Sequence, residues 1–487
     1  MQGIKHYQEK FFVNFHLSER IPEGNIYRRL KESLDLEYLR SQTKCYYGSE
    51  GQKSIDPVVF FKLMLVGYLE NISSDRKIIE QSSLRMDVLY FLGYDIDEPL
   101  PWHSTLSRTR KLFGEEVFLS FFRDILRKRV EKGMVCGKVQ AVDSAFIKAH
   151  ASTDSLVERE LQEKSKKYFD EISENEEIIQ SQEKSSNAKS GSNACKSEGK
   201  RNGRYVSKTD PDARLSCKPG KPYALNHLGI VSVDTGSHVI CGAAVDHADK
   251  RDADTIDNII GQTIENLSEN DIKIEKVLAD AAYSSGQAYK YLESLGIAAH
   301  IPAGGGYKPQ RDGFAYSKEE DCYICCQGAK LAFKRITTPK GKKTSNKTCY
   351  SSVSDCRNCP LREKCCKDKK YKRLGHSIGK PYYDAAHEMA NTYKGKPMRC
   401  LRSSTVEPVL GTLLGFLRMK KVYTKGKELA HKQLLMAAAA YNLKKLMNAT
   451  GFRGVKAAVN AVKAAFLEKI RVWSKFNLSN NKILAMQ

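Results

Sequence analysis

The stretch KVQAVDSAFIKAH, residues 138–150, constrains the fold more than any other part of the chain. Its valine, alanine and isoleucine residues are typical of a strand packed inside a β-sheet. Asp143 lies among them, and burying an unpaired carboxylate costs several kcal/mol. We therefore expect a buried strand whose carboxylate is either neutralised by a partner or lies at the edge of a site.

The sequence after this strand alternates between strand and helix patterns. Two apolar runs around the turn at residues 234–237 predict a hairpin, followed by a helix, a strand ending in VLAD, a second helix and a short strand. This order predicts a multidomain α/β protein with a mixed-sheet core at residues 136–151 and 220–302. Helices at residues 399–448 complete that core.

The remaining segments flank or interrupt the core. Residues 1–135 show apolar helical faces and helix caps, such as Asp56 before Pro57, and predict an all-α N-terminal domain, which the basic helix and the resemblance described below assign to DNA binding. Residues 152–219 are polar and low in aromatic residues, so we expect them to be largely disordered. Residues 303–398 form a basic insertion rich in cysteine, and residues 449–487 form a basic C-terminal tail.

The charge balance favours an anionic partner. The chain has 80 Lys and Arg against 57 Asp and Glu, a formal net charge of +23, which makes nucleic acid the first candidate and a merely solvated basic surface the alternative. No apolar run approaches the roughly 20 residues that span a bilayer. We therefore expect no membrane partner and a cytoplasmic protein that is associated with the nucleoid when bound to DNA.

Three carboxylates are candidates for catalysis. Asp143 lies in the first strand, Asp280 ends the VLAD strand, and Glu407 begins the helix VEPVLGTLLGF. If they converge, their hard oxygen ligands select Mg²⁺ or Mn²⁺, and two such ions activate an attacking hydroxyl and stabilise the leaving oxygen at a phosphodiester. Singly, each has an ordinary structural interpretation, as a strand end or a first-turn acid. The competing acids are Asp234, Asp246, Asp249, Asp252 and Glu388.

Several motifs in one order carry a family resemblance. VQAVDSAFIKAHAS, TDPDARL, KPYALNHLGIVSVDTGSHVICGAAV, KVLADAAYSSG and STVEPVLGTLLGFLRMKK resemble the DDE transposases of bacterial insertion sequences. The segment from DPVVFFKLMLVGYLE to HSTLSRTRKLFG is similar to the helical domain that precedes the catalytic domain in one branch of them. The resemblance covers most of residues 15–448, without the polar insertion.

This resemblance implies an RNase H-like core in which Asp143, Asp280 and Glu407 bind two magnesium or manganese ions. It implies an enzyme that binds terminal inverted repeats, hydrolyses the phosphodiester at the element ends and joins the freed 3′ hydroxyl to target DNA. Because two ends are handled together, we expect a homodimer on DNA. The alternatives are an inactive DNA-binding protein derived from such an enzyme and a nuclease of the same fold that only hydrolyses DNA.

Two basic segments are candidates for DNA contact. In the short helix TLSRTRKLF, the candidates are Arg108, Arg110 and Lys111, with an ordinary charged surface as the alternative. Around the helix of Glu407 the chain departs from the family pattern, since positions 400, 403 and 414 are Cys, Ser and Leu. The basic residues near that helix that we assign to DNA are Arg402, Arg418, Lys420 and Lys421.

The cysteines predict a structural zinc site. Eight of the fourteen lie between Cys322 and Cys366, a clustering typical of metal binding. A Cys-x2-Cys knuckle, a third Cys six residues on and an upstream Cys supply four thiolates for tetrahedral zinc. By the similar cysteine pattern of the family we favour Cys325, Cys356, Cys359 and Cys365. The alternates are Cys322, Cys326, Cys349 and Cys366, eight cysteines can hold two ions, and free cysteines remain the simpler interpretation.

Overall fold

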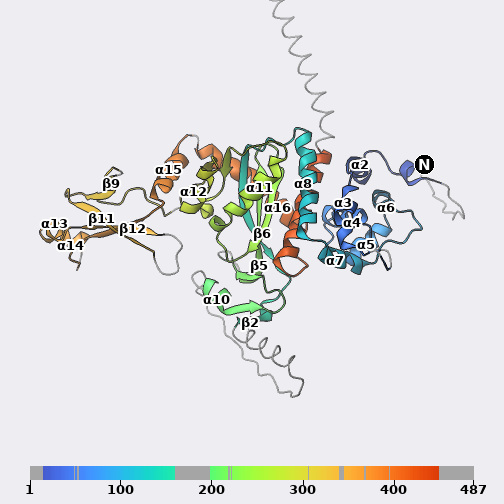
Figure 1. Ribbon diagram of the computed structural model, residues 1–487, viewed down its shortest axis with the longest axis horizontal. Coiled ribbons are helices and arrows are strands. Elements are labelled where there is room, and N and C mark those ends of the chain that lie inside the picture. Colours follow the sequence, from blue (N-terminus) through green and yellow to red (C-terminus); the bar gives the residue numbers. More distant parts are fainter. Residues whose placement is uncertain are drawn as a thin grey trace, which may run out of the picture. The chain divides into compact units, whose positions relative to one another are not determined.

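A computed structural model of the chain (Figure 1) describes residues 15–48, 50–51, 54–159, 198–217, 220, 222–304, 306–317, 319–338, 345–366, 369–393 and 395–448. The chain divides into two compact units. The first comprises residues 1–121 and 439–487, and the second comprises residues 122–438. The predicted tail at residues 449–487 lies outside the described residues.

The first unit is helical, as predicted for the N-terminal region. Asp56 caps α4 by accepting the Val58 N–H at 2.8 Å, and Pro57 takes the first helical position. Nearly every residue of α4 is buried, and Phe60 and Phe61 pack their rings at 5.3 Å in the core. The elements are α1 (Leu17–Arg20), α2 (Ile26–Ser33), α3 (Tyr38–Thr43), η1 (Lys44–Tyr46), α4 (Pro57–Leu69), α5 (Asp75–Ser83), α6 (Met86–Leu92), α7 (His103–Leu112) and the start of α8 (Glu115–Glu131).

The second unit is built on a six-stranded mixed sheet. Its strands are β1 (Val139–Lys148), β4 (Arg214–Ser216), β5 (Ala224–Asp234), β6 (Ile240–His247), β7 (Lys276–Leu278) and β8 (Ala298–His300). The order is β4-β5-β1-β7-β8, with β6 also paired to β5. Strands β1, β5 and β6 pair antiparallel, whereas β1, β7 and β8 pair parallel. This order and direction are those of an RNase H-like core, as the resemblance implied.

Helices pack on this sheet. They are α11 (Ile256–Ser268), α12 (Gly286–Ser294), α15 (Lys380–Asn391), α16 (Gly395–Phe416) and the first part, residues 427–438, of a helix over residues 427–448, with short turns η3 (Asp252–Asp254) and η4 (Ala281–Tyr283). Helix α11 lies directly on β6: a Cβ on Gly242 would come within 2.3 Å of the Thr263 hydroxyl. Helix α16 contacts β1 and β5, which brings its side chains to the middle of the sheet.

The described ends of the polar insertion form small elements. These are η2 (Thr153–Ser155), β2 (Leu156–Glu158), α10 (Glu198–Arg204) and β3 (Tyr205–Ser207), and β2 pairs with β3. The rest of that predicted disordered segment, residues 160–197, lies outside the described residues. No helix in the described part of the chain is long and apolar enough to cross a membrane.

The cysteine-rich insertion folds around a five-stranded antiparallel sheet. Its strands are β9 (Phe314–Ser317), β10 (Cys322–Cys325), β11 (Lys330–Thr337), β12 (Asn346–Ser351) and β13 (Arg373–Ser377), paired in sequence order. Two short helices, α13 (Val353–Arg357) and α14 (Arg362–Cys365), follow β12. One face of the sheet holds a core of Tyr323, Leu331, Cys349 and Leu374.

Candidate active site

Asp143 and Asp280 lie at the same edge of the mixed sheet. The last paired residues of the parallel strands β1 and β7 are Ala141 and Leu278. Asp143 lies two residues further along β1, and Asp280 lies two residues after Leu278, just beyond the end of β7. Parallel strands in register advance by equal steps, so the two acids come up side by side. This adjacency arises from the register, which aligns residues more than a hundred positions apart.

The backbone also orients both carboxylates. Asp280 follows the end of β7 and caps η4, with its Oδ1 accepting the Ala282 N–H at 2.9 Å. The Oδ1 of Asp143 accepts the Ser144 N–H at 2.8 Å. Asp280 thus has the strand-end role predicted as its ordinary interpretation, yet that role also aims its carboxylate beside Asp143.

Helix α16 brings Glu407 and Arg402 to the same place. The Arg402 Nη1 donates to Asp143 Oδ2 at 3.0 Å, and its Nη2 donates to Glu407 Oε1 at 2.9 Å. The Arg402 side chain is only 14% exposed, whereas the Glu407 side chain is 57% exposed. The sequence predicted Arg402 as a surface DNA contact, but the structure positions its guanidinium between two of the three candidate acids.

These side chains line one cavity of about 710 Å³. The competing acid Asp252 lines it too, and Ser144 Oγ donates to Asp252 Oδ1 at 2.6 Å. Local sequence carries no signal for this, because Asp252 reaches the cavity from η3 after a different strand. The other competing acids lie elsewhere: Asp234 accepts the Ser237 N–H in the hairpin turn, Asp246 pairs with Lys250, Asp249 with Arg214, and Glu388 is exposed on α15.

Burial and neighbouring charges shift the pKa values of acidic groups in the site. Burial raises the pKa of Asp143, and the nearby charge of Asp280 raises it further, while the Ser144 N–H and Arg402 act in the opposite direction without cancelling the rise. The fully buried Tyr283 lies close by, and burial together with Asp252 and Asp143 raises its pKa well above the ordinary value. Perturbed pKa values of this kind cluster at functional sites.

The carboxylate side chains of the site are the type of ligand that binds a hard divalent cation. Carboxylate oxygens are the ligands that Mg²⁺ and Mn²⁺ prefer. Arg402 already supplies a positive charge between Asp143 and Glu407. Within the described ranges, however, no three His, Cys, Asp or Glu side chains are gathered closely enough to hold a metal ion. The acids would therefore have to exchange Arg402 for metal.

The predicted DNA contacts of α7 divide into two groups. Arg108 and Lys111 are exposed. Arg110 is buried, and its Nη1 and Nη2 donate to the Asp75 carboxylate at 3.1 and 2.8 Å. The prediction that Arg110 contacts DNA is therefore corrected: its side chain points into the helical core, where it is needed to neutralise a carboxylate from α5.

The predicted contacts after α16 also divide. Arg418 is only 8% exposed and adopts a left-handed backbone conformation, with φ of 63°. Its predicted contact with DNA is corrected as well, because the chain turns at this point and directs the side chain inward. Lys420 is exposed and Lys421 is half-buried beside the end of β1. These two lysines remain predictions.

The four favoured cysteines line a second cavity. Cys325, Cys356, Cys359 and Cys365 surround a space of about 610 Å³, together with the alternate Cys366. The other alternates lie outside it, since Cys349 is part of the sheet core and Cys322 and Cys326 are not among the lining residues. The side chains are not close enough to form a metal group in the described part of the chain.

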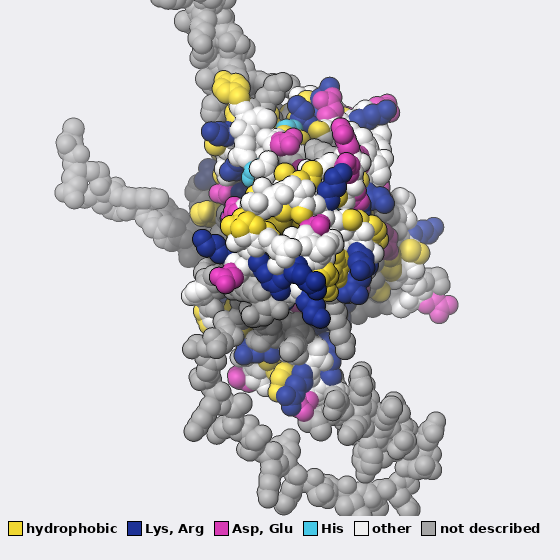
Figure 2. Space-filling view, turned by 90° about the vertical axis from the view of Figure 1, so that its left-hand side faces the viewer, with side chains coloured by type: hydrophobic (Ala, Val, Ile, Leu, Met, Phe, Trp, Pro, Cys, Tyr) yellow, Lys and Arg dark blue, Asp and Glu magenta, His cyan; other side chains and the backbone are white. Residues whose placement is uncertain are grey.

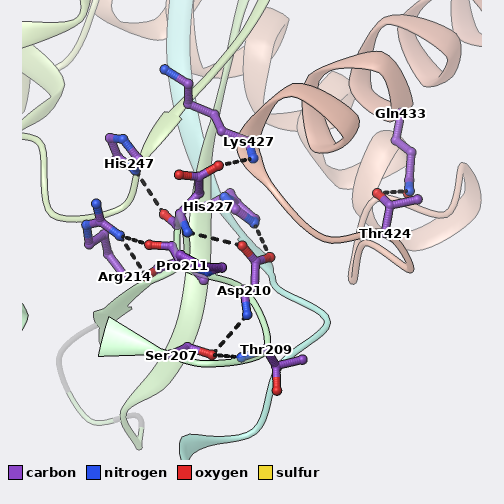
Figure 3. Close-up of polar contacts among 12 residues, drawn as sticks. Ser207, Thr209, Asp210, Pro211, Arg214, His227, His247, Thr424, Lys427 and Gln433 are labelled. Atoms are coloured by element: carbon purple, nitrogen blue, oxygen red, sulfur yellow. Dashed lines mark hydrogen bonds and ion pairs between the residues drawn. The ribbon is translucent and has the colours of Figure 1, made fainter. Parts of the chain in front are cut away.

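The TDPDARL segment forms a buried polar cluster instead of a part of the cavity (Figure 3). Asp210 and His227 are fully buried, and Asp210 Oδ2 lies 3.1 Å from His227 Nε2. Burial raises the pKa of Asp210, but the contact with His227 and the hydrogen bonds from the Gly426 and Asp212 N–H groups together lower it, and the net shift is downward. Asp212 Oδ2 accepts the Lys427 N–H at 3.0 Å. This part of the polar insertion therefore contacts β5 and the start of the helix over residues 427–448.

Comparisons with known proteins add family information. Residues 15–112 match a family described as a transposase domain (DUF772), and residues 324–447 match one described as a transposase DDE domain. No curated protein matches the chain. Among solved structures, the chain is similar to the piggyBac transposase in a synaptic complex with hairpin DNA, at 8% identity and a TM-score of 0.30, over 88% of this chain and 75% of that one.

The two family matches bear differently on the candidate site. The match at residues 324–447 contains Glu407 and most of the cysteines, whereas Asp143 and Asp280 precede it. The assignment of the two aspartates therefore rests on the register of β1 and β7 and on the cavity that they share with Glu407.

Proposed function

We propose that this chain, which its two family matches identify as a DDE transposase, binds the terminal inverted repeats of an insertion sequence and cleaves and joins DNA through Asp143, Asp280 and Glu407. The proposal includes hydrolysis at the element ends and attack of the freed 3′ hydroxyl on target DNA. A homodimer on DNA is the expected form, because both ends must be processed together.

One observation carries this proposal. Three acids from β1, the end of β7 and α16 line a single cavity at the edge of an RNase H-like sheet. A cluster of like charges is costly unless a cation relieves the repulsion. Such a cost is tolerated at functional sites and is uncommon elsewhere. The geometry therefore favours an active enzyme over an inactive DNA-binding derivative.

Each residue has a distinct part in the proposed chemistry. Asp143, Asp280 and Glu407 would hold two magnesium or manganese ions, which when bound activate a hydroxyl nucleophile and stabilise the leaving oxygen. The Ser144 N–H and the η4 cap keep the two aspartates oriented. Arg402, once released from Asp143 and Glu407, would be a cation of the cavity that can contact an incoming phosphate. Asp252 holds the Ser144 hydroxyl and bounds the cavity.

A structural zinc ion is the second part of the proposal. Cys325, Cys356, Cys359 and Cys365 share one cavity, and their spacing along the sequence suits a closed tetrahedral thiolate site, which the side chains would have to approach one another to form. Cys366 lines the same cavity and is the one alternate that remains. Such a site would stabilise the insertion and take no part in the chemistry.

The deciding experiment uses DNA carrying the element ends, which are recognisable as inverted repeats flanking the gene. Purified protein is incubated with that DNA, a second duplex, and Mg²⁺ or Mn²⁺. Joining of 3′ ends to the second duplex supports transposition, cleavage without joining indicates a nuclease, and binding without either indicates an inactive derivative. The change Asp143→Asn should abolish cleavage and leave binding intact.

Glu388→Gln is the matched control for the triad. Glu388 is an exposed acid on α15, outside the cavity, so its neutralisation removes one negative charge without touching the site. We expect normal cleavage from this variant. Full activity of the Asp143→Asn protein, or an equal loss in both variants, would refute the assignment of the triad.

A further inference from the structure

The five-stranded sheet of the cysteine-rich insertion has two unlike faces. One face carries the core of Tyr323, Leu331, Cys349 and Leu374, with partly buried aromatic residues packed against it. None of the five strands, all within the described ranges, contains an acidic residue. Their basic residues are Lys330, Lys334, Arg335, Lys347 and Arg373. The strands of this sheet therefore carry basic and no acidic side chains to its second face, opposite the core.

A β-bulge places two cations together on that second face. The pairing of β11 with β12 shifts between Phe333 and Arg335, so Lys334 is the extra residue. On β12, Tyr350 lies on the face opposite to the buried Cys349, and its partner on β11 is Ala332. Without the bulge, the alternation of side chains would send Arg335 to the core face. With it, Arg335 pairs with Thr348, which shares the face of Tyr350.

Aromatic rings support the cations of this face. The Lys334 ammonium lies 5.6 Å from the Tyr350 ring centroid, and the Arg373 guanidinium lies 5.9 Å from it. Tyr371 packs against Tyr350 at 5.4 Å and is 40% exposed. Because the Tyr350 ring contacts two cations, it holds them in place and does not serve as a free platform for stacking a base.

The cations of this face have no acidic partner among the described residues. Lys334, Arg335 and Arg373 are exposed and make no ion pair there. The nearby acids Glu320 and Asp321 are instead paired with Lys330 at 2.9 Å and with Lys347 at 2.5 Å. Figure 2, which looks at one side of the molecule, shows Lys and Arg side chains gathered in a band with hydrophobic side chains among them.

We propose that this basic sheet face, defined as Lys334, Arg335, Tyr350, Tyr371 and Arg373, binds the sugar-phosphate backbone of duplex DNA. This inference rests on the proposed DNA transposase function and identifies a contact surface away from the candidate active site. Strands β11 and β13 are two strand spacings apart, about 10 Å, which corresponds to about three base-pair steps along the DNA axis. Phosphate contacts position the DNA without reading its sequence.

The test measures DNA affinity of the full-length protein as a function of salt. The probe is a duplex of random sequence, and the variant combines Lys334→Ala, Arg335→Ala and Arg373→Ala. We expect weaker binding, and a slope of log affinity against log salt that is smaller by about 1 for each residue removed, or about 3 in total. Unchanged affinity and slope would overturn the proposal.

Lys330→Ala is the matched control. Lys330 lies on the same strand, but Glu320 already neutralises its charge, so we expect little change in affinity or slope. A loss equal to that of the triple variant would refute the specific role of this face. Circular dichroism of both variants checks that the sheet folds. A separate variant that carries only the change Tyr350→Leu keeps all the positive charges of the face and tests whether the Tyr350 ring orients them.

The failure of this inference is distinguishable from failure of the proposed function. If the wild-type protein cleaves and joins DNA while the triple variant binds with unchanged salt dependence, only the surface assignment is wrong. If wild-type protein does not bind DNA at all, the proposed function itself fails. If the face binds an acidic protein segment or a second copy of the chain instead, the triple variant keeps its DNA affinity, which overturns the proposal.

Discussion

Removing Arg402 should make the candidate active site bind divalent cations more tightly. Arg402→Gln takes the positive charge from between Asp143 and Glu407 and keeps a polar side chain. The contact with Glu407 counts for little, because the Glu407 side chain is 57% exposed and such pairs contribute about 0–1 kcal/mol. The contact with Asp143 dominates, since both side chains are largely buried and the distance is 3.0 Å.

The magnitude follows from that second contact. A hydrogen bond to a charged group contributes about 1.5–3 kcal/mol, and a cation that binds Asp143 must first displace it. Taking about 2 kcal/mol, the apparent affinity for Mn²⁺ should rise about 30-fold in the Arg402→Gln protein. Direct titration of Mn²⁺ into the protein without DNA measures this, because no turnover is needed.

Arg399→Gln provides the comparison on the same helix. Arg399 is exposed and its Nη2 donates to the Ala390 carbonyl, so it holds no carboxylate of the site. We expect its Mn²⁺ affinity to equal that of the wild type. If Arg402→Gln binds Mn²⁺ no more tightly than Arg399→Gln, Arg402 does not compete with metal and the reasoning is wrong.

Three further changes test other parts of the structure. Arg110→Ala should lower the free energy of unfolding by about 3 kcal/mol, because it leaves the Asp75 carboxylate without its partner in the helical core. Arg108→Ala should change the free energy of unfolding by no more than about 0.5 kcal/mol in the same denaturation experiment. Equal effects of the two changes would contradict the corrected role of Arg110. Asp210→Asn should destabilise the protein at neutral pH. Since the pKa of Asp210 is lowered in the folded state, the stability it adds is present above its ordinary pKa of about 3.9 and is lost as the pH falls through the folded value. The difference from wild type should therefore shrink in acid, and a difference that persists at low pH argues against the Asp210–His227 contact. Cys359→Ser should reduce the zinc content of purified protein, whereas Cys326→Ser should not, because only Cys359 lines the cysteine cavity; equal zinc in all three proteins would refute the site.

Short-range features of the fold were accessible from the sequence. The β1 strand, the hairpin turn at Asp234 and the Asp56 cap of α4 depend on residues within a few positions of one another. The resemblance then paired Asp143, Asp280 and Glu407, and the structure gathers them around one cavity. The same local patterns misjudged Arg110, because α7 looks like a basic surface helix until the position of Asp75 is known.

Other features required the folded chain because their partners are distant in sequence. Arg402 and Asp143 are separated by 259 positions, and no pattern within α16 indicates that its guanidinium meets a carboxylate of β1. Likewise, the bulge that turns Arg335 to the basic face is a property of the pairing between β11 and β12, and the cysteine sequence does not specify which of eight thiols share a cavity.

The sequence by itself determined the residue types that the proposed chemistry needs: three acids in a fixed order, clustered cysteines and an excess of positive charge. Helix and strand periodicity depend on neighbouring residues, so the helices and strands could be predicted from the sequence. Only the tertiary structure decided which charges meet, which are buried and which face solvent. The physical reason is that electrostatic energy depends on distance and burial in space, and both are set by packing between segments that lie far apart along the chain.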